Sequence, residues 1–269
     1  MIVHDGPGGS AVSGLANSFQ SKYLEGPRKG VVSAYNLGLK ESTGDVVAFT
    51  DDDAVPRSDW IERLARAYSP GIGGVGGTVQ PTRSTRLQPP LTSTTIRKDG
   101  RTNGWLRIAG GIIEIDHLRG ANMSFSREAI ARTGLFDWNY SGDGSKFETD
   151  YCVRIRRKGF KLLYDPDALV FHNESDTRLV PRKRSPSKAY YKTRNNTYFA
   201  FKNFTGGKNS LALGGITVRR VFRTARFLVS RRDVTYACGL AGFAVGVSKC
   251  ALNELRGDSL SSIGFGNRE

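Results

Sequence analysis

Residues 44–60 read GDVVAFTDDDAVPRSDW, a short apolar run followed by three consecutive aspartates. The β-branched and aromatic residues of Val46–Thr50 predict a buried strand that ends where the aspartates begin. Open α/β sheets bind their ligands at the carboxyl ends of their strands. The stretch therefore predicts a strand whose end carries a charged, ligand-binding site.

Three adjacent carboxylates repel one another unless a cation or a set of hydrogen-bond donors neutralises them. In extended backbone Asp51 and Asp53 point to the same side, so they can act together on one ion. A hard divalent cation such as Mg2+ accepts one or two carboxylates together with substrate phosphates. The alternative is structural: an acidic turn before a helix from Asp59 to Tyr68, with Ser58 as N-cap and Glu62 in the first turn.

The rest of the chain alternates between strand and helix patterns. We predict strands at 1–3, 73–79, 112–115, 160–164 and 168–171, and helices at 12–23, 30–40, 126–134 and 148–158. This alternation predicts an α/β fold with a mostly parallel central sheet and helices on both faces. Residues 80–111 lack such a pattern and predict a long loop that contributes to the site.

The net charge of +15 comes from one part of the chain. Residues 178–232 contain 15 Lys and Arg and no Asp or Glu, so the remainder holds equal numbers of basic and acidic residues. Such segregation favours a surface for anionic lipid or phosphate-bearing substrates over a solvated basic face. Nucleic acid is a disfavoured partner, because no zinc-finger spacing or RNA-binding aromatic signature accompanies the charge.

The C-terminal part of the chain has helical patterns. Apolar residues from Val218 to Val229 recur at three- and four-residue steps with arginines off that face, which predicts a basic amphipathic helix. The uncharged run 234–248 corresponds to about 22 Å of helix, short of the ~30 Å bilayer core, so it is either a packed helix or one that dips into a membrane. We therefore divide the chain into a domain at 1–205 and a helical basic extension at 206–269. Three cysteines without metal-like spacing, and no signal segment, favour a reducing compartment.

Three pieces of the sequence resemble the family-2 glycosyltransferases, whose nucleotide-sugar domain has the GT-A fold. They read YNLGLKESTGDVVAFTDDDAVPRSDWIE (35–62), LRGANMSFSREAIARTGLFD (118–137) and ETDYCVRIRRKGFKLLYDPDALVFH (148–172). They occur in the family's order. The resemblance implies an inverting transfer of a sugar from a nucleoside-diphosphate donor, with Mg2+ or Mn2+ as cofactor.

The resemblance also implies roles on the donor side. Asp51 and Asp53 match the family's D-x-D positions, where the last carboxylate coordinates a metal on the diphosphate and the first helps to hold the ribose and the metal. Asp52, between them, is a further donor-binding candidate. Asp5 matches a position that commonly contacts the base. Tyr35 stands where the family often has an arginine that meets the diphosphate, which is a departure from the pattern.

On the acceptor side, the resemblance implies that Glu148 is the general base, with Asp150 as the second candidate. The alternative is that both only complement a helix dipole. Gly120 and Asn122 match a turn below the donor sugar, although an asparagine there can equally stabilise the turn. His172 falls where some relatives place a metal or diphosphate contact, and a structural histidine is the alternative.

Together these features predict an enzyme on the cytoplasmic face of a membrane that transfers sugar to a glycan or a lipid-linked acceptor. The alternative is a GT-A-like protein that has lost catalysis and uses residues 178–232 to hold anionic lipid or nucleic acid. The family also has a strand and a helix before the piece that begins here at Met1. We therefore expect the sheet to lack an inner strand and to leave backbone groups unpaired.

Overall fold

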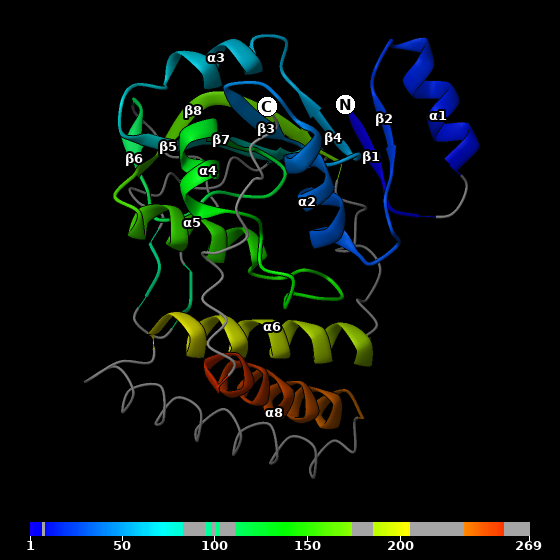
Figure 1. Ribbon diagram of the computed structural model, residues 1–269, viewed down its shortest axis with the longest axis vertical. Coiled ribbons are helices and arrows are strands. Elements are labelled where there is room, and N and C mark those ends of the chain that lie inside the picture. The colour runs from blue at the N-terminus through cyan, green and yellow to red at the C-terminus, as the bar shows by residue number, and fades with distance from the viewer. Residues whose placement is uncertain are drawn as a thin grey trace.

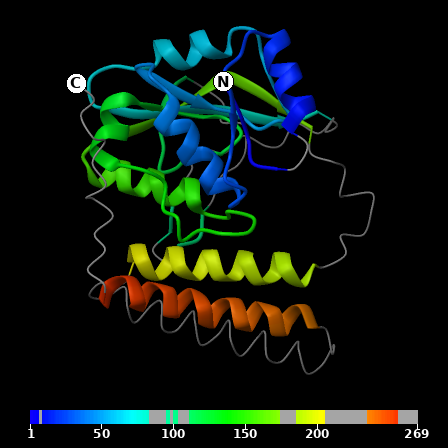
Figure 2. The same cartoon turned by 45° about the vertical axis from the view of Figure 1, so that its right-hand side comes forward.

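The computed structural model describes residues 1–6, 9–82, 95–97, 100–102, 111–173, 185–204 and 234–255. A central sheet is covered by helices on both faces (Figure 1). Below the lower face, two long helices lie side by side as outer layers, and the turned view shows the same arrangement (Figure 2). The prediction of an α/β fold with helices on both faces of a sheet is confirmed.

The central sheet is mixed, which corrects the prediction of a mostly parallel sheet. Its order is β3 (Val46–Phe49), β7 (Met123–Ser126), β5 (Ile72–Pro81), β8 (Lys161–His172) and β4 (Ala54–Pro56), with β6 (Ile113–Glu114) beside β8. Among the described strands of this sheet only β5 and β8 pair in parallel, and the other pairs are antiparallel. The sequence pattern misleads because β4 and β7, of 3 and 4 residues, lie in turn-like sequence that does not indicate a strand.

Strand β8 is one element of 12 residues where we predicted two. The pairing with β5 shifts register between Gly77 and Val79, opposite the segment around Pro166. A side chain at Gly77 would collide with the carbonyl oxygen of Ala168, so only glycine fits this close approach. The irregularity lets β8 continue past the proline, and its last residue reaches the end of the sheet that carries the aspartates.

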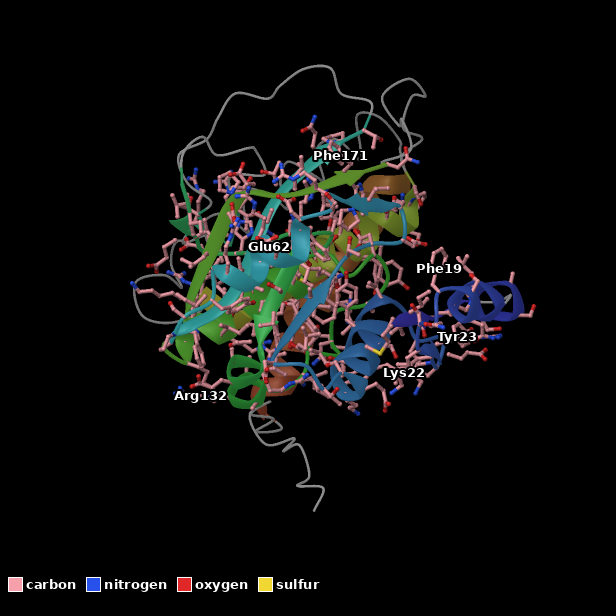
Figure 3. All side chains as sticks on the ribbon, turned by 90° about the horizontal axis from the view of Figure 1, so that it is seen from above. Phe19, Lys22, Tyr23, Glu62, Arg132 and Phe171 are labelled. Atoms are coloured by element: carbon pink, nitrogen blue, oxygen red, sulfur yellow. The ribbon has the colours of Figure 1, made fainter. Side chains whose placement is uncertain are left out.

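The N-terminal strands form a separate parallel pair, β1 (Ile2–His4) and β2 (Tyr23–Glu25). Helix α1 (Gly9–Ser18) ends earlier than predicted, because Gln20 adopts a left-handed φ of 49°. Figure 3 shows Phe19, Lys22 and Tyr23 at this margin of the molecule, away from Phe171 of β8. In the described part of the chain β1 pairs only with β2, and β3 ends the path of the central sheet.

Helices α2 (Val31–Glu41), α4 (Arg127–Thr133) and α5 (Phe147–Arg157) share one hydrophobic core on one face of the sheet. On the other face, α3 (Trp60–Arg66) packs over a smaller core. The hydroxyl of Ser126 accepts a hydrogen bond from the Ala129 N–H at 3.3 Å and caps α4, and the predicted helix 126–134 agrees with α4 to within one residue at each end. The predicted cap at Ser58 is wrong: Asp59 occupies that position, and its carboxylate binds Arg57 instead.

The two outer helices are α6 (Pro186–Phe204) and α8 (Val234–Leu255). Side chains at Gly242 and Gly246 would collide with the backbone oxygens of Tyr190 and Arg194, so the two backbones are in close contact. None of the described helices is long and apolar enough to cross a membrane. The predicted helix at 218–229 lies outside the described residues, and the division of the chain after residue 205 stays a prediction.

Candidate active site

Asp51, Asp53 and His172 converge at the end of the central sheet. The His172 Nε2 atom lies 3.3 Å from Asp51 Oδ2 and 3.1 Å from Asp53 Oδ1. Potential ligand atoms of the three side chains all lie within 4.8 Å of one another. The carboxylates are 38% and 47% exposed, so solvent and ligands reach them. Two oxygens and one nitrogen at this spacing fit a divalent transition metal such as Mn2+.

The sheet register explains this convergence. Ala54 of β4 pairs with His172 of β8, so the residue before Ala54 lies beside the imidazole. The Ala54 N–H donates to the Asp51 carbonyl at 3.2 Å, and this tight turn brings Asp51 back to the same place. Asp52 occupies the outer corner of the turn, is exposed, and is not part of the cluster.

Tyr35 of α2 joins the cluster from the opposite side. Its hydroxyl donates to Asp51 Oδ1 at 3.2 Å, and its ring stacks on Phe49 with centroids 5.0 Å apart. Burial, reinforced by the Asp51 carboxylate, raises the pKa of the phenol well above its ordinary value, so it stays a neutral donor. A Cβ atom at Gly120 would lie 3.8 Å from this hydroxyl, which places the Gly120 turn at the site.

Glu148 lies in the first turn of α5 and is half-buried. Burial raises the pKa of its carboxyl to about 7; its own backbone N–H and Lys146 oppose the shift, and the negative charges of Asp51 and Asp143 reinforce it. Because Asp51 acts on this carboxyl, Glu148 lies within electrostatic range of the aspartate cluster. A carboxylate that titrates near neutral pH is suited to accept a proton.

Asp150 follows on the same turn but points elsewhere, since residues two apart in a helix are rotated by about 200°. Its carboxylate is 0% exposed and accepts hydrogen bonds from Lys202 Nζ at 2.8 Å and Arg154 Nε at 3.1 Å. Asn203 donates a third, at 2.8 Å. Burial opposes the charge, but Lys202 and Arg154 outweigh it and lower the pKa of this carboxyl. The Asp150 carboxylate is therefore fully engaged in hydrogen bonds with side chains of the protein.

Two other candidates also have protein partners. Both oxygens of Asp5 accept backbone N–H groups, from Arg28 and Gly30, each at 2.7 Å, and so order the loop that leads into α2. Asn122 is 0% exposed. Its amide accepts from Trp60 Nε1 at 2.9 Å and donates to the carbonyls of Thr78 and Ala168, so it ties α3 to the sheet from inside the core.

Sequence reasoning missed Lys202 and Asp137, which complete the buried polar cluster around Asp150. Lys202 Nζ lies 2.8 Å from both Asp137 Oδ2 and Asp150 Oδ2. The only signal in the sequence is a polar pair, Lys202 and Asn203, inside the aromatic run Phe199–Phe204. A charge among aromatic residues on a helix is a sign of a buried partner.

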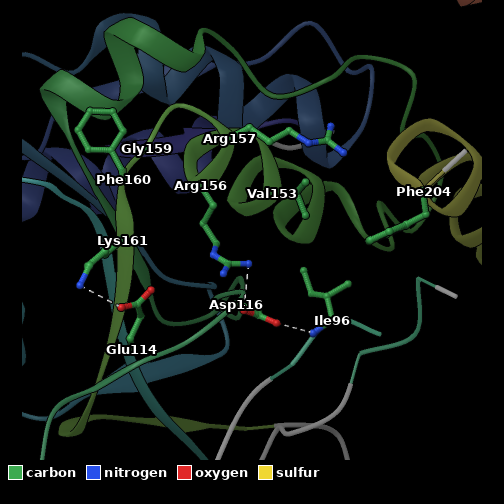
Figure 4. A pocket seen from close by; sticks show the side chains of 10 residues that line it. All are labelled: Ile96, Glu114, Asp116, Val153, Arg156, Arg157, Gly159, Phe160, Lys161 and Phe204. Atoms are coloured by element: carbon green, nitrogen blue, oxygen red, sulfur yellow. Dashed lines mark hydrogen bonds and ion pairs between the residues drawn. The ribbon is translucent and has the colours of Figure 1, made fainter. Parts of the chain in front are cut away.

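A separate cavity of about 500 Å³ lies at the opposite end of α5 (Figure 4). Two ion pairs line it, Arg156 with Asp116 at 2.9 Å and Lys161 with Glu114 at 3.3 Å. None of the predicted site residues contributes to its wall. The cavity is therefore distinct from the aspartate cluster.

A mixed sheet with a carboxylate-rich site at its end is the architecture of the GT-A glycosyltransferases. The mannosyltransferase PcManGT from Pyrobaculum calidifontis, solved with GDP-Man and Mn2+, aligns over 93% of this chain and 75% of its own, with a TM-score of 0.50 and 17% identity. GalNAc-T7, solved with UDP, GalNAc and Mn2+, aligns over 76% of this chain and 45% of its own, with a TM-score of 0.51 and 13% identity. These likenesses establish the GT-A fold.

Residues 5–132, a little under half of the chain, match the family described as glycosyl transferase family 2. The glucosyl-dolichyl phosphate glucuronosyltransferase of Haloferax volcanii is 32% identical over 154 residues. That match covers 54% of this chain and 48% of the relative, so the chain spans about half the length of this relative. The resemblance predicted from three sequence pieces is thereby confirmed.

Proposed function

We propose that this chain transfers a sugar from a nucleoside-diphosphate sugar to a glycan or lipid-linked acceptor, with inversion at the anomeric carbon. The observation that carries the proposal is the cluster of Asp51, Asp53 and His172 within electrostatic range of Glu148, whose pKa is raised to about 7. The GDP-Man, UDP and Mn2+ of the solved neighbours support a nucleotide-sugar donor. The dolichyl phosphate in the name of the Haloferax relative supports a lipid-linked acceptor.

Asp51, Asp53 and His172 are the residues that hold the metal in this proposal. The set fits Mn2+ better than Mg2+, because it contains an imidazole nitrogen and Mg2+ prefers oxygen ligands. When bound, the cation neutralises the charge of the departing diphosphate as a Lewis acid. Tyr35 fixes the orientation of the Asp51 carboxylate through the 3.2 Å hydrogen bond.

Glu148 is the general base in this proposal. Its carboxylate takes the proton from the acceptor hydroxyl while that oxygen forms the new bond to the anomeric carbon. The bond from this carbon to the diphosphate oxygen breaks, and the electron pair leaves with the diphosphate. A single displacement of this kind inverts the configuration. Asp150 serves as structural support instead, because its carboxylate is fully buried and bound by Lys202 and Arg154.

In this proposal the nucleobase of the donor binds at the loop that Asp5 orders, and the acceptor binds on the side of Gly120. Asp5 acts through the backbone of Arg28 and Gly30, which its carboxylate holds at the start of α2. Gly120 leaves open the space next to the Tyr35 hydroxyl, so a substrate can approach the backbone there.

A membrane surface on the cytoplasmic side is the proposed location of the reaction. The support is the excess positive charge of residues 178–232, which suits anionic headgroups. Sedimentation with vesicles of phosphatidylglycerol and phosphatidylcholine tests this part. We expect pelleting at low salt that is lost at high salt, and absence of pelleting at low salt would remove the membrane from the proposal.

The central experiment measures release of nucleoside diphosphate from a panel of GDP- and UDP-sugars, with MnCl2 or MgCl2 and with either a polyprenyl-linked or a free oligosaccharide acceptor. We expect release that requires metal and acceptor and that is lost in Asp53→Ala and Glu148→Ala. The exposed Glu62 of α3 provides the matched control, Glu62→Ala, which should keep the wild-type rate. Absence of release across the panel, together with absence of donor binding by calorimetry, would overturn the proposal in favour of a binding protein.

A further inference from the structure

We propose that Lys202 of α6 is a positioning residue: it locks the first turn of α5 and thereby orients Glu148. This inference rests on the proposed function of Glu148 as the base. Lys202 lies well beyond residues 5–132, the part of the chain that matches the family, and contacts no residue of the aspartate cluster in the described part of the chain. Its action on the reaction is therefore through α5.

Lys202 bridges two carboxylates from different segments. Its Nζ atom lies 2.8 Å from Asp137 Oδ2 and 2.8 Å from Asp150 Oδ2. Both carboxylates are 0% exposed, and the lysine is 17% exposed. Burying this many charged groups costs free energy, and their mutual contacts offset the cost only while the geometry is kept. The triad therefore holds the first turn of α5 in one position relative to the Asp137 loop.

Neighbouring residues of α6 strengthen the same junction. The Tyr198 hydroxyl donates to Asp137 Oδ2 at 2.8 Å, and Asn203 Nδ2 donates to Asp150 Oδ1 at 2.8 Å. The Asn203 side chain also accepts from Arg157 at 3.0 Å, at the other end of α5. Helix α6 thus forms hydrogen bonds with residues at both ends of α5.

Helix α6 also fixes the loop that precedes Glu148. Asn195 Nδ2 donates to the Ser141 carbonyl at 2.8 Å, and Gly142 packs so closely on the Tyr191 ring that no side chain would fit. This loop ends at Lys146, which has a left-handed φ of 78° and whose charge acts on the Glu148 carboxyl. Glu148 therefore lies between two attachments to α6, one before it and one after it.

A first helical turn needs such external support. Its N–H groups lack intrahelical partners, so backbone hydrogen bonds alone restrain it weakly. No side chain at the N-cap position, Lys146, forms a capping hydrogen bond here. A displacement of a catalytic group by about 1 Å lowers a rate by about 100-fold, so loss of the lock should be measurable in kcat.

The test compares Lys202→Met with Lys202→Arg, which keeps the charge, and with Lys192→Met, an exposed lysine of the same helix. Activity is metal-dependent release of nucleoside diphosphate, and hydrogen–deuterium exchange of residues 141–150 reports the position of the turn. We expect Lys202→Met to lower kcat by about 100-fold, with the donor KM and the Mn2+ affinity within about threefold of wild type. Exchange in 141–150 should rise, Lys202→Arg should recover most of kcat, and Lys192→Met should match wild type.

The inference would be overturned if Lys202→Met and Lys192→Met had equal kcat and equal exchange. It would also be overturned if the fall in kcat of Lys202→Met were fully explained by a smaller fraction of folded protein. If Lys202→Met does not fold, Asp150→Asn is the second variant, because it keeps the volume and leaves Lys202 paired with Asp137. A folded Asp150→Asn with wild-type kcat would also overturn it. Failure of the proposed function is seen separately, as a wild-type chain inactive with every donor, and the exchange experiment then still decides whether Lys202 holds the turn.

Discussion

Two clusters of charged side chains lie near Glu148 in the described structure, and they differ in exposure and in pairing. The open cluster consists of Asp51, Asp53 and His172, and the closed cluster of Asp137, Asp150 and Lys202. Each has two carboxylates and one basic side chain. The carboxylates of the open cluster are 38% and 47% exposed, and both carboxylates of the closed cluster are 0% exposed.

The difference teaches that residue type alone does not define a metal site. In the closed cluster a lysine, an arginine and an asparagine supply hydrogen bonds to Asp150, and the pKa of that carboxyl is lowered. The negative charge of Asp150 is already compensated by these side chains, so this cluster offers little electrostatic stabilisation to a metal cation. In the open cluster the structure shows a histidine between the carboxylates and a tyrosine on Asp51, which leaves negative charge available to a cation.

The largest expected effect comes from the open cluster. Asp53→Asn removes one charged ligand, and the loss of several kcal/mol of charge stabilisation should lower metal-dependent release by about 1,000-fold. Initial rates over a MnCl2 series measure it. Asp45→Asn, at the exposed start of the same strand region, is the matched control. Equal losses in the two variants would show that the open cluster is not the metal site.

Substitutions in the closed cluster should lower the free energy of unfolding. Asp137→Asn leaves the ammonium of Lys202 with a single carboxylate in a buried position, and we expect unfolding free energy to fall by about 3–5 kcal/mol. Denaturant unfolding followed by circular dichroism measures this. Asp167→Asn, whose ion pair with Arg63 is 55% exposed at the aspartate, should change stability by less than about 1 kcal/mol. A small effect of Asp137→Asn would remove the contrast between the two clusters.

Glu148→Gln should make the protein more stable at alkaline pH while abolishing transfer. The pKa of Glu148 is raised from 4.5 to about 7 in the folded chain, so ionising it costs folding free energy as pH rises through this window. The neutral amide of the variant carries no such cost. We expect a gain on the order of 2–3 kcal/mol at pH 8 that disappears at pH 4. Unfolding curves at the two pH values measure it, and an equal difference at both would contradict a raised pKa.

The smallest expected effect concerns Tyr35. Tyr35→Phe removes one hydrogen bond to Asp51, worth about 1 kcal/mol, so Mn2+ affinity should fall by less than about tenfold. Isothermal titration with MnCl2 measures the affinity. Tyr68→Phe removes a similar hydrogen bond, to Ser124, and should leave Mn2+ affinity unchanged. A Tyr35→Phe variant that no longer binds Mn2+ would make Tyr35 part of the ligand set.

The open cluster could be predicted because its residues lie in short, strongly patterned segments. An apolar strand followed by Asp51 and Asp53 fixes the strand end, and His172 ends a second apolar run. The apolar spacing after Glu148 predicted the helix that this residue begins, whereas its role as a base came only from the family resemblance. The predicted helix 148–158 agrees with α5 to within one residue at each end.

The closed cluster and the sheet topology could not be predicted, because both depend on long-range pairing. Lys202 meets Asp150 across 52 positions of sequence, and no local pattern encodes that contact. Strands β4 and β7 are too short for a period of two to be visible, so the sequence does not reveal the direction of pairing. Asn122 fits a turn motif equally well on the surface or inside the core, and only the structure shows that it is buried.

The attachment of α6 to the first turn of α5 has a practical consequence for dissecting this protein. The segment that matches the family ends at residue 132, and the last of the described strands ends at His172, so a natural choice for a minimal fragment is to stop just after that strand. Such a fragment would keep Asp137 and Asp150 but lose the Lys202 ammonium that lies between them. Any chimera or shortened version meant to test the proposed sugar transfer should therefore extend through Phe204.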